Sequence, residues 1–345
     1  MATAQTPVES RILSMQSAGI GLKRGRVELA LHNPKWRRCF SNEAYSIFDA
    51  LKIEGLRLFH IGSTSVPGIS AKPVIDILGS VQSLDLLDVA QSQLQNLGYQ
   101  YKGEYGISGR RYCTLYNAEA TTAYVHIHFF EHTNPAVRSH ILFRDYLRAN
   151  PEIARAYSEM KNDLVTGEVA RLDYSDRKSP MIARISADSE VWDSNPKFVL
   201  KILGTALDGS HTKQLLESSD LLGAKTKIIN LSELAISNYL YDSSQYRADD
   251  FLKTARQMTE ADVIVFATPV YWYSMAGVMK TFFDRFSDLL SGEHKSLGDS
   301  LYGKKMKLVA TGYDETLPLG FEVPFAATAI YFGMDYLGAN YESFR

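Results

Sequence analysis

The chain has 345 residues, of which 45% are apolar and 22% charged, with a formal net charge of -2. This length predicts two domains, and the near-neutral charge gives no electrostatic basis for nucleic acid as the main partner. Cys39 and Cys113 have neither CxxC nor zinc spacing, so we expect a reducing, cytoplasmic compartment. No apolar stretch reaches the roughly 20 residues that a membrane-spanning helix needs.

The N-terminal half shows an α+β order. Residues 1–26 are rich in Ser, Ala and Gln and predict a flexible tail, with an organelle transit peptide as the alternative. A domain is expected over 27–185 with a small mixed sheet. Its predicted helices cover 28–51 after the Asn33-Pro34 break, 84–97, and 136 to about 169, and its predicted strands cover 56–61, 74–78, 111–116 and 124–130.

A glycine-containing turn between the first two of these strands resembles a phosphate-binding loop. Its sequence is HIGSTSVPG, and Asp76 lies on the returning strand. In nucleotidyltransferase chemistry, Gly-Ser holds phosphate oxygens and two carboxylates on the next strand hold Mg²⁺. Leu78 stands where the second carboxylate would be, so the usual metal pair is incomplete.

His126 and His128 alternate along a strand and therefore share one face, which we expect to point toward Asp76 and His60. Such a set can bind a divalent metal or a phosphate, and hydrogen-bonded structural histidines remain the alternative. Asp76, His126 and His128 are the candidate metal ligands. The candidate phosphate or nucleotide site comprises His60, Gly62, Ser63, Thr64, Ser65, Lys72, Asp76, His126 and His128.

The segment from about 27 to 185 resembles the GrpB family, a nucleotidyltransferase-fold group. The resemblance rests on NPKW at 33–36, the HIGSTSVPG…KPVIDI block, HIHFF and NPAVRSHILFRDYLRANPEIARAY. It implies a nucleotidyltransferase-like α+β fold and a pocket. It leaves the reaction of this half undefined.

The polar segment 186–196 predicts a linker, and strand and helix then alternate regularly over a second domain, 197–345. This order predicts a doubly wound α/β domain with a five-stranded parallel sheet, in which ligands bind beyond the carboxyl ends of the strands. The predicted strands are 198–203, 225–231, 262–268, 305–311 and 335–341. The predicted helices are 210–222, 248–260, 275–291 and 321–332.

Three loops should meet at that edge. The first turn, with Gly204, enters a helix whose N–H groups suit a phosphate monoester, although an ordinary βα turn capped by Ser210 has the same pattern. After the third strand, Tyr271, Trp272 and Tyr273 form an aromatic run where a loop is normally polar, which suits a planar ring. The candidate cofactor contacts are Gly204, Thr205, Ser210, His211, Thr212, Pro269, Val270, Tyr271, Trp272, Tyr273, Thr311, Gly312 and Tyr313.

This half resembles the flavodoxin-like NAD(P)H-dependent FMN reductases, most strongly at TPVYWYSMAGVMKTFFDRFSDLL. The resemblance implies FMN and NAD(P)H as cofactors, a small-molecule substrate, a homodimer, and hydride chemistry carried by the flavin without a catalytic base. The family usually has Gly-Ser-x-Arg in its phosphate loop, whereas Thr205 and Leu207 stand at the Ser and Arg positions. His211 is a candidate replacement contact, or else faces solvent.

Together the two resemblances predict a fusion of a GrpB-like domain with a flavin-dependent NAD(P)H oxidoreductase. Two alternatives remain open from the sequence. One is a nucleotidyltransferase-type enzyme in the N-terminal half with a flavin-binding or dimerising C-terminal module. The other is a non-catalytic nucleotide- and flavin-binding protein, suggested by Leu78 and Leu207.

Overall fold

The computed structural model describes residues 6–165, 171–192, 198–205, 209–218, 224–241 and 249–344. The chain divides into two compact units, Met1–Ser194 and Asn195–Arg345, and each is described by itself. The last helix of the first unit, α7 (Arg171–Trp192), runs through most of the predicted linker. The sequence SADSEVW therefore continues a helix, and residues 193–196 lie outside the described ranges.

Unit 1 is built on a mixed sheet, as predicted. Its strand order is β2-β3-β6-β5-β4, and β1 pairs with β6. The pair β3–β6 is parallel and the other pairs are antiparallel. The strands are β1 (Leu22–Lys23), β2 (Arg57–Ile61), β3 (Ile75–Val81), β4 (Tyr99–Tyr101), β5 (Arg111–Tyr116) and β6 (Thr122–Glu131).

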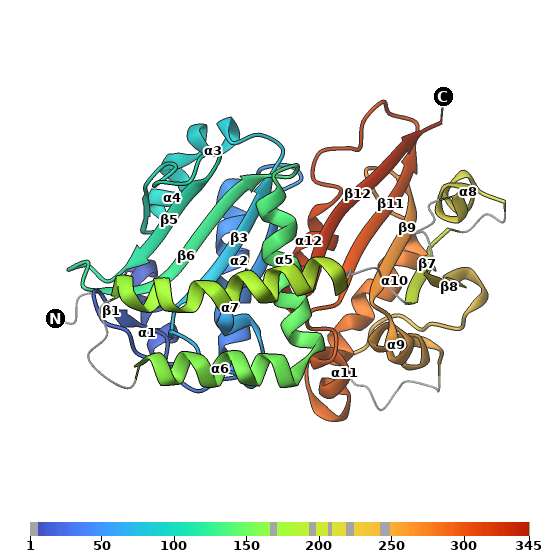
Figure 1. The fold of residues 1–345 in the computed structure, drawn as a ribbon. Helices are drawn as coiled ribbons and strands as arrows, with labels where there is room; N and C mark the ends of the chain where they lie inside the picture. The colour runs from blue at the N-terminus through green and yellow to red at the C-terminus, as the bar shows by residue number, and fades with distance from the viewer. Residues whose placement is uncertain are drawn as a thin grey trace. The chain divides into compact units, whose positions relative to one another are not determined.

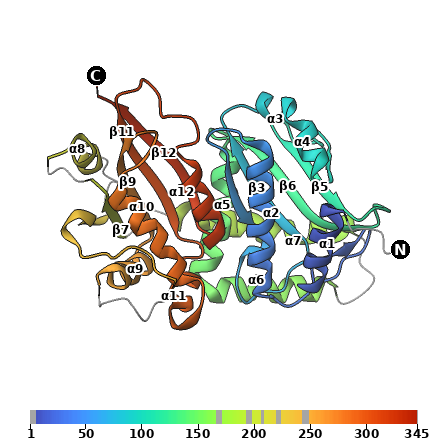
Figure 2. The same ribbon diagram turned by 180° about the vertical axis from the view of Figure 1, so that it is seen from behind.

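Helices cover both faces of this sheet. In Figure 1, α5 and α7 lie in front of it, and in Figure 2 α2 lies in front of its opposite face. Ile141 of α5 packs on Phe59 and Leu78, whereas Phe40 of α2 stacks on His60. Besides α7, the helices are α1 (Pro7–Ser17), α2 (Lys35–Leu51), α3 (Asp85–Val89), α4 (Gln91–Asn96), α5 (Pro135–Ala149) and α6 (Pro151–Val165), and a 3₁₀ turn, η1, covers Ser63–Ser65.

The predicted flexible tail over 1–26 is wrong for its described residues, because they include α1. Thr6 and Glu9 form a capping box, in which each side chain accepts the other's backbone N–H. Met15 is buried, and the Arg11 guanidinium pairs with the buried carboxylate of Glu43 at 2.5 Å. The Thr-x-x-Glu spacing is a helix-start signal, so this segment was predictable as structure.

Unit 2 has the predicted parallel sheet. The strand order is β12-β11-β9-β7-β8, which in chain order is 2-1-3-4-5, the flavodoxin-like arrangement. A short strand that the sequence did not predict, β10 (Ser274–Met275), turns back antiparallel on β9. The parallel strands are β7 (Phe198–Leu203), β8 (Lys225–Asn230), β9 (Val263–Tyr271), β11 (Lys305–Gly312) and β12 (Asp335–Ser343).

The alternating side chains of β9 divide the core of unit 2 between two faces. Val265 packs with Leu216 of α8 on one face. On the other face, Phe266 contacts Phe282 of α10 and Phe325 of α12 at ring-centroid distances of 6.3 and 6.4 Å. The helices are α8 (His211–Ser218), α9 (Phe251–Glu260), α10 (Gly277–Asp284), α11 (Lys295–Asp299) and α12 (Val323–Phe332). Among the helices described, none has the length and apolarity needed to cross a membrane.

Candidate functional site

Three loops of unit 2 leave the sheet at the carboxyl ends of β7, β9 and β11, as the parallel order requires. The first and third of them are in contact. Thr212, in the first turn of α8, and Thr311, at the end of β11, are both buried, and their hydroxyl oxygens lie 2.6 Å apart. The first and third loops therefore meet at one edge of the sheet, as predicted, and are in direct contact there.

The aromatic run forms the turn of the β9–β10 hairpin, with Tyr271 paired to Ser274. Trp272 and Tyr273 occupy the two turn positions with φ of 50° and 63°, where glycine or asparagine is normally found. Their side chains are 94% and 73% exposed, so burial of the rings does not offset the backbone cost of about 1 kcal/mol or more per residue. A strained turn that presents aromatic rings to solvent indicates a binding function.

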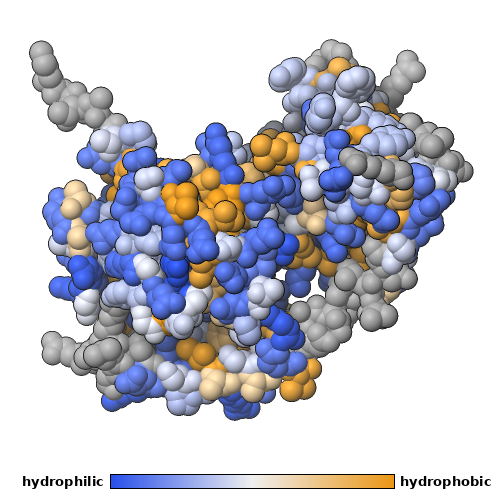
Figure 3. Space-filling model, turned by 90° about the horizontal axis from the view of Figure 1, so that it is seen from above, coloured by the Kyte–Doolittle hydropathy of each residue, from blue (hydrophilic) through white to orange (hydrophobic). Residues whose placement is uncertain are grey.

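Further apolar surface accompanies this turn. Tyr313, in the loop after β11, is also strongly exposed. Figure 3 shows the surface on one side of the chain, with small hydrophobic patches set among hydrophilic residues. Pro269 is buried and Val270 is half-buried, so they support the hairpin while the three following side chains are presented.

The glycines of the two outer loops have packing roles. The N–H of Gly204 donates to the carbonyl of Ala267, and a Cβ at Gly204 would lie 2.8 Å from Cβ of Met279. A Cβ at Gly312 would lie 2.8 Å from the Tyr341 hydroxyl and 3.3 Å from Cβ of Val270. The N–H of Gly204 is thus already engaged, and close helix–strand packing explains this glycine.

The start of α8 is only partly described, because Ala206, Leu207 and Asp208 lie outside the described residues. Ser210 caps the helix by accepting the N–H of Lys213 at 3.3 Å, and among the described residues its hydroxyl donates to no acceptor. His211 is exposed and stacks on Phe344 with ring centroids 3.9 Å apart. Thr205 is buried beside this loop.

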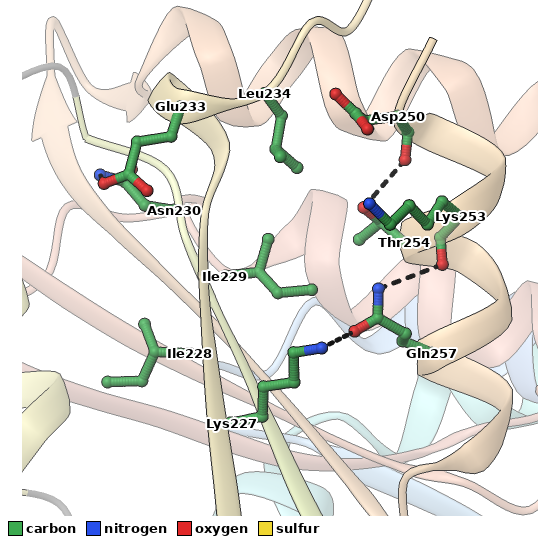
Figure 4. Close-up of a pocket in the computed structure, with 10 residues that line it drawn as sticks. All are labelled: Lys227, Ile228, Ile229, Asn230, Glu233, Leu234, Asp250, Lys253, Thr254 and Gln257. Atoms are coloured by element: carbon green, nitrogen blue, oxygen red, sulfur yellow. Dashed lines mark hydrogen bonds between the residues drawn. The ribbon is translucent and has the colours of Figure 1, made fainter. Parts of the chain in front are cut away.

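A pocket of about 220 Å³ lies elsewhere in unit 2, between the edge strand β8 and α9 (Figure 4). Lys227 donates to Gln257 across it. It is smaller than the ~300 Å³ or more typical of ligand sites, and none of its lining residues belongs to the three loops. We therefore place the candidate cofactor site at the loops.

In unit 1 the strand register places Thr114, His126 and Asp76 in one row across β5, β6 and β3. Asp76 and His126 approach to 3.4 Å. Burial opposes ionisation of Asp76, but the hydrogen bond from His126 and its neighbouring charges outweigh burial and hold the pKa of Asp76 below its ordinary value. The predicted shared face of Asp76, His126 and His128 is present, since His128 pairs with Leu78 in the same register.

The predicted position of His60 is wrong. His60 pairs with Ile77, not with Asp76, so its side chain lies on the opposite face of the sheet, where it stacks on Phe40 at 4.8 Å. Its Nε2 lies 3.1 Å from the Thr64 hydroxyl, and burial lowers the pKa of His60 well below its ordinary value. It is a neutral core histidine that braces the turn.

The tentative metal site is also not formed. Within the described part of the chain, no three His, Cys, Asp or Glu side chains are arranged to hold a metal ion. Burial lowers the pKa of His128 to about 4, and its Nδ1 lies 3.3 Å from the Arg110 guanidinium, a cation that would repel a metal.

Other predicted residues of this turn serve its structure. Gly62 has φ 69°, and a Cβ there would lie 2.5 Å from the Asp76 carboxylate, so only glycine lets the turn meet β3. Ser65 donates its hydroxyl to the Gly62 carbonyl at 2.6 Å. The Lys72 ammonium lies 4.2 Å from the Tyr174 ring centroid.

Ser63 faces a partner that the sequence did not indicate. Lys161 of α6, 2% exposed, donates to the Ser63 hydroxyl at 2.9 Å and to the Ser70 carbonyl at 2.5 Å. Tyr157, one helical turn earlier, interacts with Ser63 and lies under the Lys161 ammonium at 4.4 Å. The i, i+4 spacing of a tyrosine and a lysine is too common to have marked this cluster.

The two units thus define a chain with a flavodoxin-like α/β domain and an α+β domain that carries a Gly-Ser turn. Family models match both: "GrpB protein" over residues 26–188 and "NADPH-dependent FMN reductase" over residues 198–317.

Curated relatives match the first unit. The glutamate-rich protein GrpB of Alkalihalophilus pseudofirmus is 33% identical over 148 residues, which cover 42% of this chain and 84% of that protein. The UPF0157 protein YqkA of Bacillus subtilis is 42% identical over 139 residues, and the match spans only 40% of its length and 40% of this chain. The crystal structure of GrpB from Enterococcus faecalis has 33% identity, covers 48% of this chain and 100% of that one, and has a TM-score of 0.44.

The chain belongs to the GrpB family through unit 1, and unit 2 is a domain of the NADPH-dependent FMN reductase family. The predicted fusion of a GrpB domain with an FMN reductase-type domain is confirmed at the level of the two domains.

Proposed function

We propose that unit 2 is an FMN-dependent NAD(P)H oxidoreductase. The observation that carries the proposal is the exposed hairpin turn of Trp272 and Tyr273, held in an unfavourable backbone conformation at the ligand-binding edge of a flavodoxin-like sheet. The family match over residues 198–317 supports the same activity.

The residues present fit FMN. The Ser210 hydroxyl lies at the start of α8, where backbone N–H groups favour a phosphate, and would donate to it; Thr205 and Thr212 border the same turn. The exposed rings of Tyr271, Trp272 and Tyr273 would offer stacking surface to the flavin, and the segment 311–313, whose Thr311 contacts Thr212, would supply further contacts. His211 would stand at the rim of this site, on Phe344.

When bound, FMN would supply the hydride chemistry, and the chain's own residues would orient it and exclude water. In this division of labour the hydroxyls and aromatic rings at this edge would bind and orient the cofactor. Either NADH or NADPH fits this role, with a small-molecule acceptor. We further propose a cytoplasmic protein that acts as a homodimer.

The experiment is FMN binding followed by absorbance and flavin fluorescence, with steady-state oxidation of NADH and NADPH in the presence of menadione. Trp272→Ala and Tyr271→Ala should each weaken FMN binding by about tenfold, since stacking on an aromatic side chain contributes roughly 1–3 kcal/mol per ring. Tyr331→Ala removes an exposed aromatic from the surface of α12 and is the matched control.

If both hairpin variants bound FMN as tightly as the wild type, the flavin ring would not bind at this edge of the sheet. A wild-type protein that binds FMN but oxidises neither nicotinamide would leave unit 2 as a flavin-binding module and reject the oxidoreductase.

A further inference from the structure

Two side chains at the end of β12 hold the loop that follows β11, the neighbouring strand of the sheet (Figure 1). Tyr341 and Ser343 lie two residues apart on β12, so their side chains share one face. The Tyr341 hydroxyl donates to the carbonyl of Asp314 at 2.7 Å. The Ser343 hydroxyl donates to the carbonyl of Tyr313 at 3.4 Å. The loop is therefore tied to this face of β12 through its backbone.

A backbone hydrogen bond adds a third contact. The N–H of Phe344, directly after β12, donates to the carbonyl of Gly312 at 2.8 Å. Three successive carbonyl groups, those of residues 312–314, are thus bound by β12 and the residue that follows it. Because a peptide unit is planar, fixing its carbonyl also fixes its N–H, so the backbone of this segment is held in one orientation. It presents the ring of Tyr313, which is 82% exposed.

The same end of β12 reaches the first loop of the candidate cofactor site. The ring of Phe344 stacks on that of His211, the first residue of α8, with a centroid distance of 3.9 Å and an interplanar angle of 21°. His211 is exposed and Phe344 is half-buried, so this stack adds little to the core of unit 2. The next residue of α8, Thr212, contacts Thr311. Two neighbouring contacts therefore join the start of α8 to the ends of β11 and β12.

The third loop in turn contacts the aromatic hairpin. Gly312 has two close neighbours, since a Cβ there would lie 2.8 Å from the Tyr341 hydroxyl and 3.3 Å from Cβ of Val270. Val270 lies in β9, directly before the aromatic run. The end of β12 thus contacts the first and third loops directly and the hairpin through a single glycine.

We propose that Tyr341 and Phe344 are positioning residues that preorganise the third loop for the cofactor. The inference rests on the proposed FMN site and extends it to residues beyond the family match, which ends at residue 317. A loop that is free in the unliganded protein must be ordered when a ligand binds, and this ordering lowers the affinity. Binding the loop to β12 in advance reduces that cost. In this role both residues act through the loop and need no contact with the flavin.

The test is FMN binding to the full chain, followed by flavin fluorescence. Tyr341→Phe removes only the hydroxyl that binds the Asp314 carbonyl, and Phe344→Leu removes the stacking ring. Each variant should bind FMN about fivefold more weakly, which corresponds to the loss of one hydrogen bond or one ring contact. Phe344→Tyr keeps a stacking ring and should retain the affinity of the wild type.

Tyr336→Phe is the matched control. Tyr336 lies near the other end of β12 and donates its hydroxyl to the Glu322 carboxylate at 2.9 Å, so this variant loses a comparable hydrogen bond from the same strand. It should lower the melting temperature at least as much as Tyr341→Phe does. Its affinity for FMN should nevertheless stay within about twofold of the wild type, because the third loop keeps its three contacts with the end of β12.

Amide hydrogen exchange of the FMN-free protein tests the loop without the cofactor. Tyr341→Phe and Phe344→Leu should speed exchange in the segment 312–315, whereas Tyr336→Phe should leave it unchanged. Unchanged exchange in both of the first two variants would show that β12 does not hold the loop, and the inference would be wrong.

The binding data separate this inference from the proposed function. If the wild type bound FMN and Tyr341→Phe and Phe344→Leu bound it equally tightly, the positioning role would be rejected while the FMN site remained. An equal loss of affinity in Tyr336→Phe would also reject it, because the effect would then follow from general destabilisation. A wild-type protein that does not bind FMN would reject the proposed function and this inference together.

Discussion

The two candidate sites differ in how their residues are distributed along the chain. In unit 2 each contact segment is contiguous, as in the Tyr271–Tyr273 run, and the strand ends bring the segments together. In unit 1 the Ser63 hydroxyl meets Lys161, 98 residues later, through the packing of α6 against the turn. A contiguous site depends on local backbone geometry, whereas an assembled site depends on the packing of remote elements.

The variant with the largest expected effect on stability tests the packing of remote elements in unit 1. Arg11→Met should lower the free energy of unfolding by about 3 kcal/mol, because it leaves the buried Glu43 carboxylate without its cation. Chemical denaturation followed by circular dichroism measures this. The Arg11 guanidinium also donates to the Leu97 carbonyl, so the variant loses a tie between α1 and the end of α4.

Arg26→Met is the matched control from the same predicted tail. Arg26 pairs with Glu28 at 3.4 Å on the surface, and its loss should change stability by less than about 0.5 kcal/mol. If the two variants were equally stable, α1 would be the dispensable tail that the sequence composition suggested.

The sequence predicted most of the fold because hydrophobic periodicity is a local signal. The first strand of unit 2 was predicted with its observed bounds, 198–203, and the parallel order followed from alternation. The helix α7 was missed because its polar, weakly periodic sequence resembles a linker, and Pro180 lies inside it. The hairpin at Trp272 was missed because turn rules require glycine or asparagine there.

The site prediction failed where a shift of one residue in strand register decides on which face of the sheet a side chain lies. His60 was expected near Asp76, but the antiparallel pairing of β2 with β3 sets Ile61 opposite Asp76 and turns His60 away. Register is a tertiary property that a single strand does not encode. Lys161 was not predicted because the sequence of its helix does not indicate which element the helix packs against.

A variant with an intermediate expected effect tests whether Gly204 is needed for packing or for phosphate binding. If this glycine serves packing, Gly204→Ala should cost about 2 kcal/mol, because its Cβ would press on Met279. FMN affinity measured well below the melting temperature should then change by less than about threefold. Gly277→Ala is the control: nothing lies within 4 Å of its Cβ position at the start of α10, so this change should be neutral or slightly stabilising. A large loss of FMN affinity with little loss of stability would instead make Gly204 a direct phosphate contact.

The smallest effect tests whether the aromatic turn is kept for function at the expense of stability. The double variant Trp272→Asn, Tyr273→Gly has the residues that two-residue hairpin turns prefer when both turn positions have positive φ. Relief of backbone strain should raise the melting temperature of the FMN-free protein by a few degrees, on the order of 1 kcal/mol, while FMN affinity falls. Trp272→Ala removes a ring without supplying a better turn, so it should lower FMN affinity without that gain in stability. A double variant that loses stability would show that the exposed rings stabilise the fold, and the contiguous site of unit 2 would then depend on packing as the assembled site of unit 1 does.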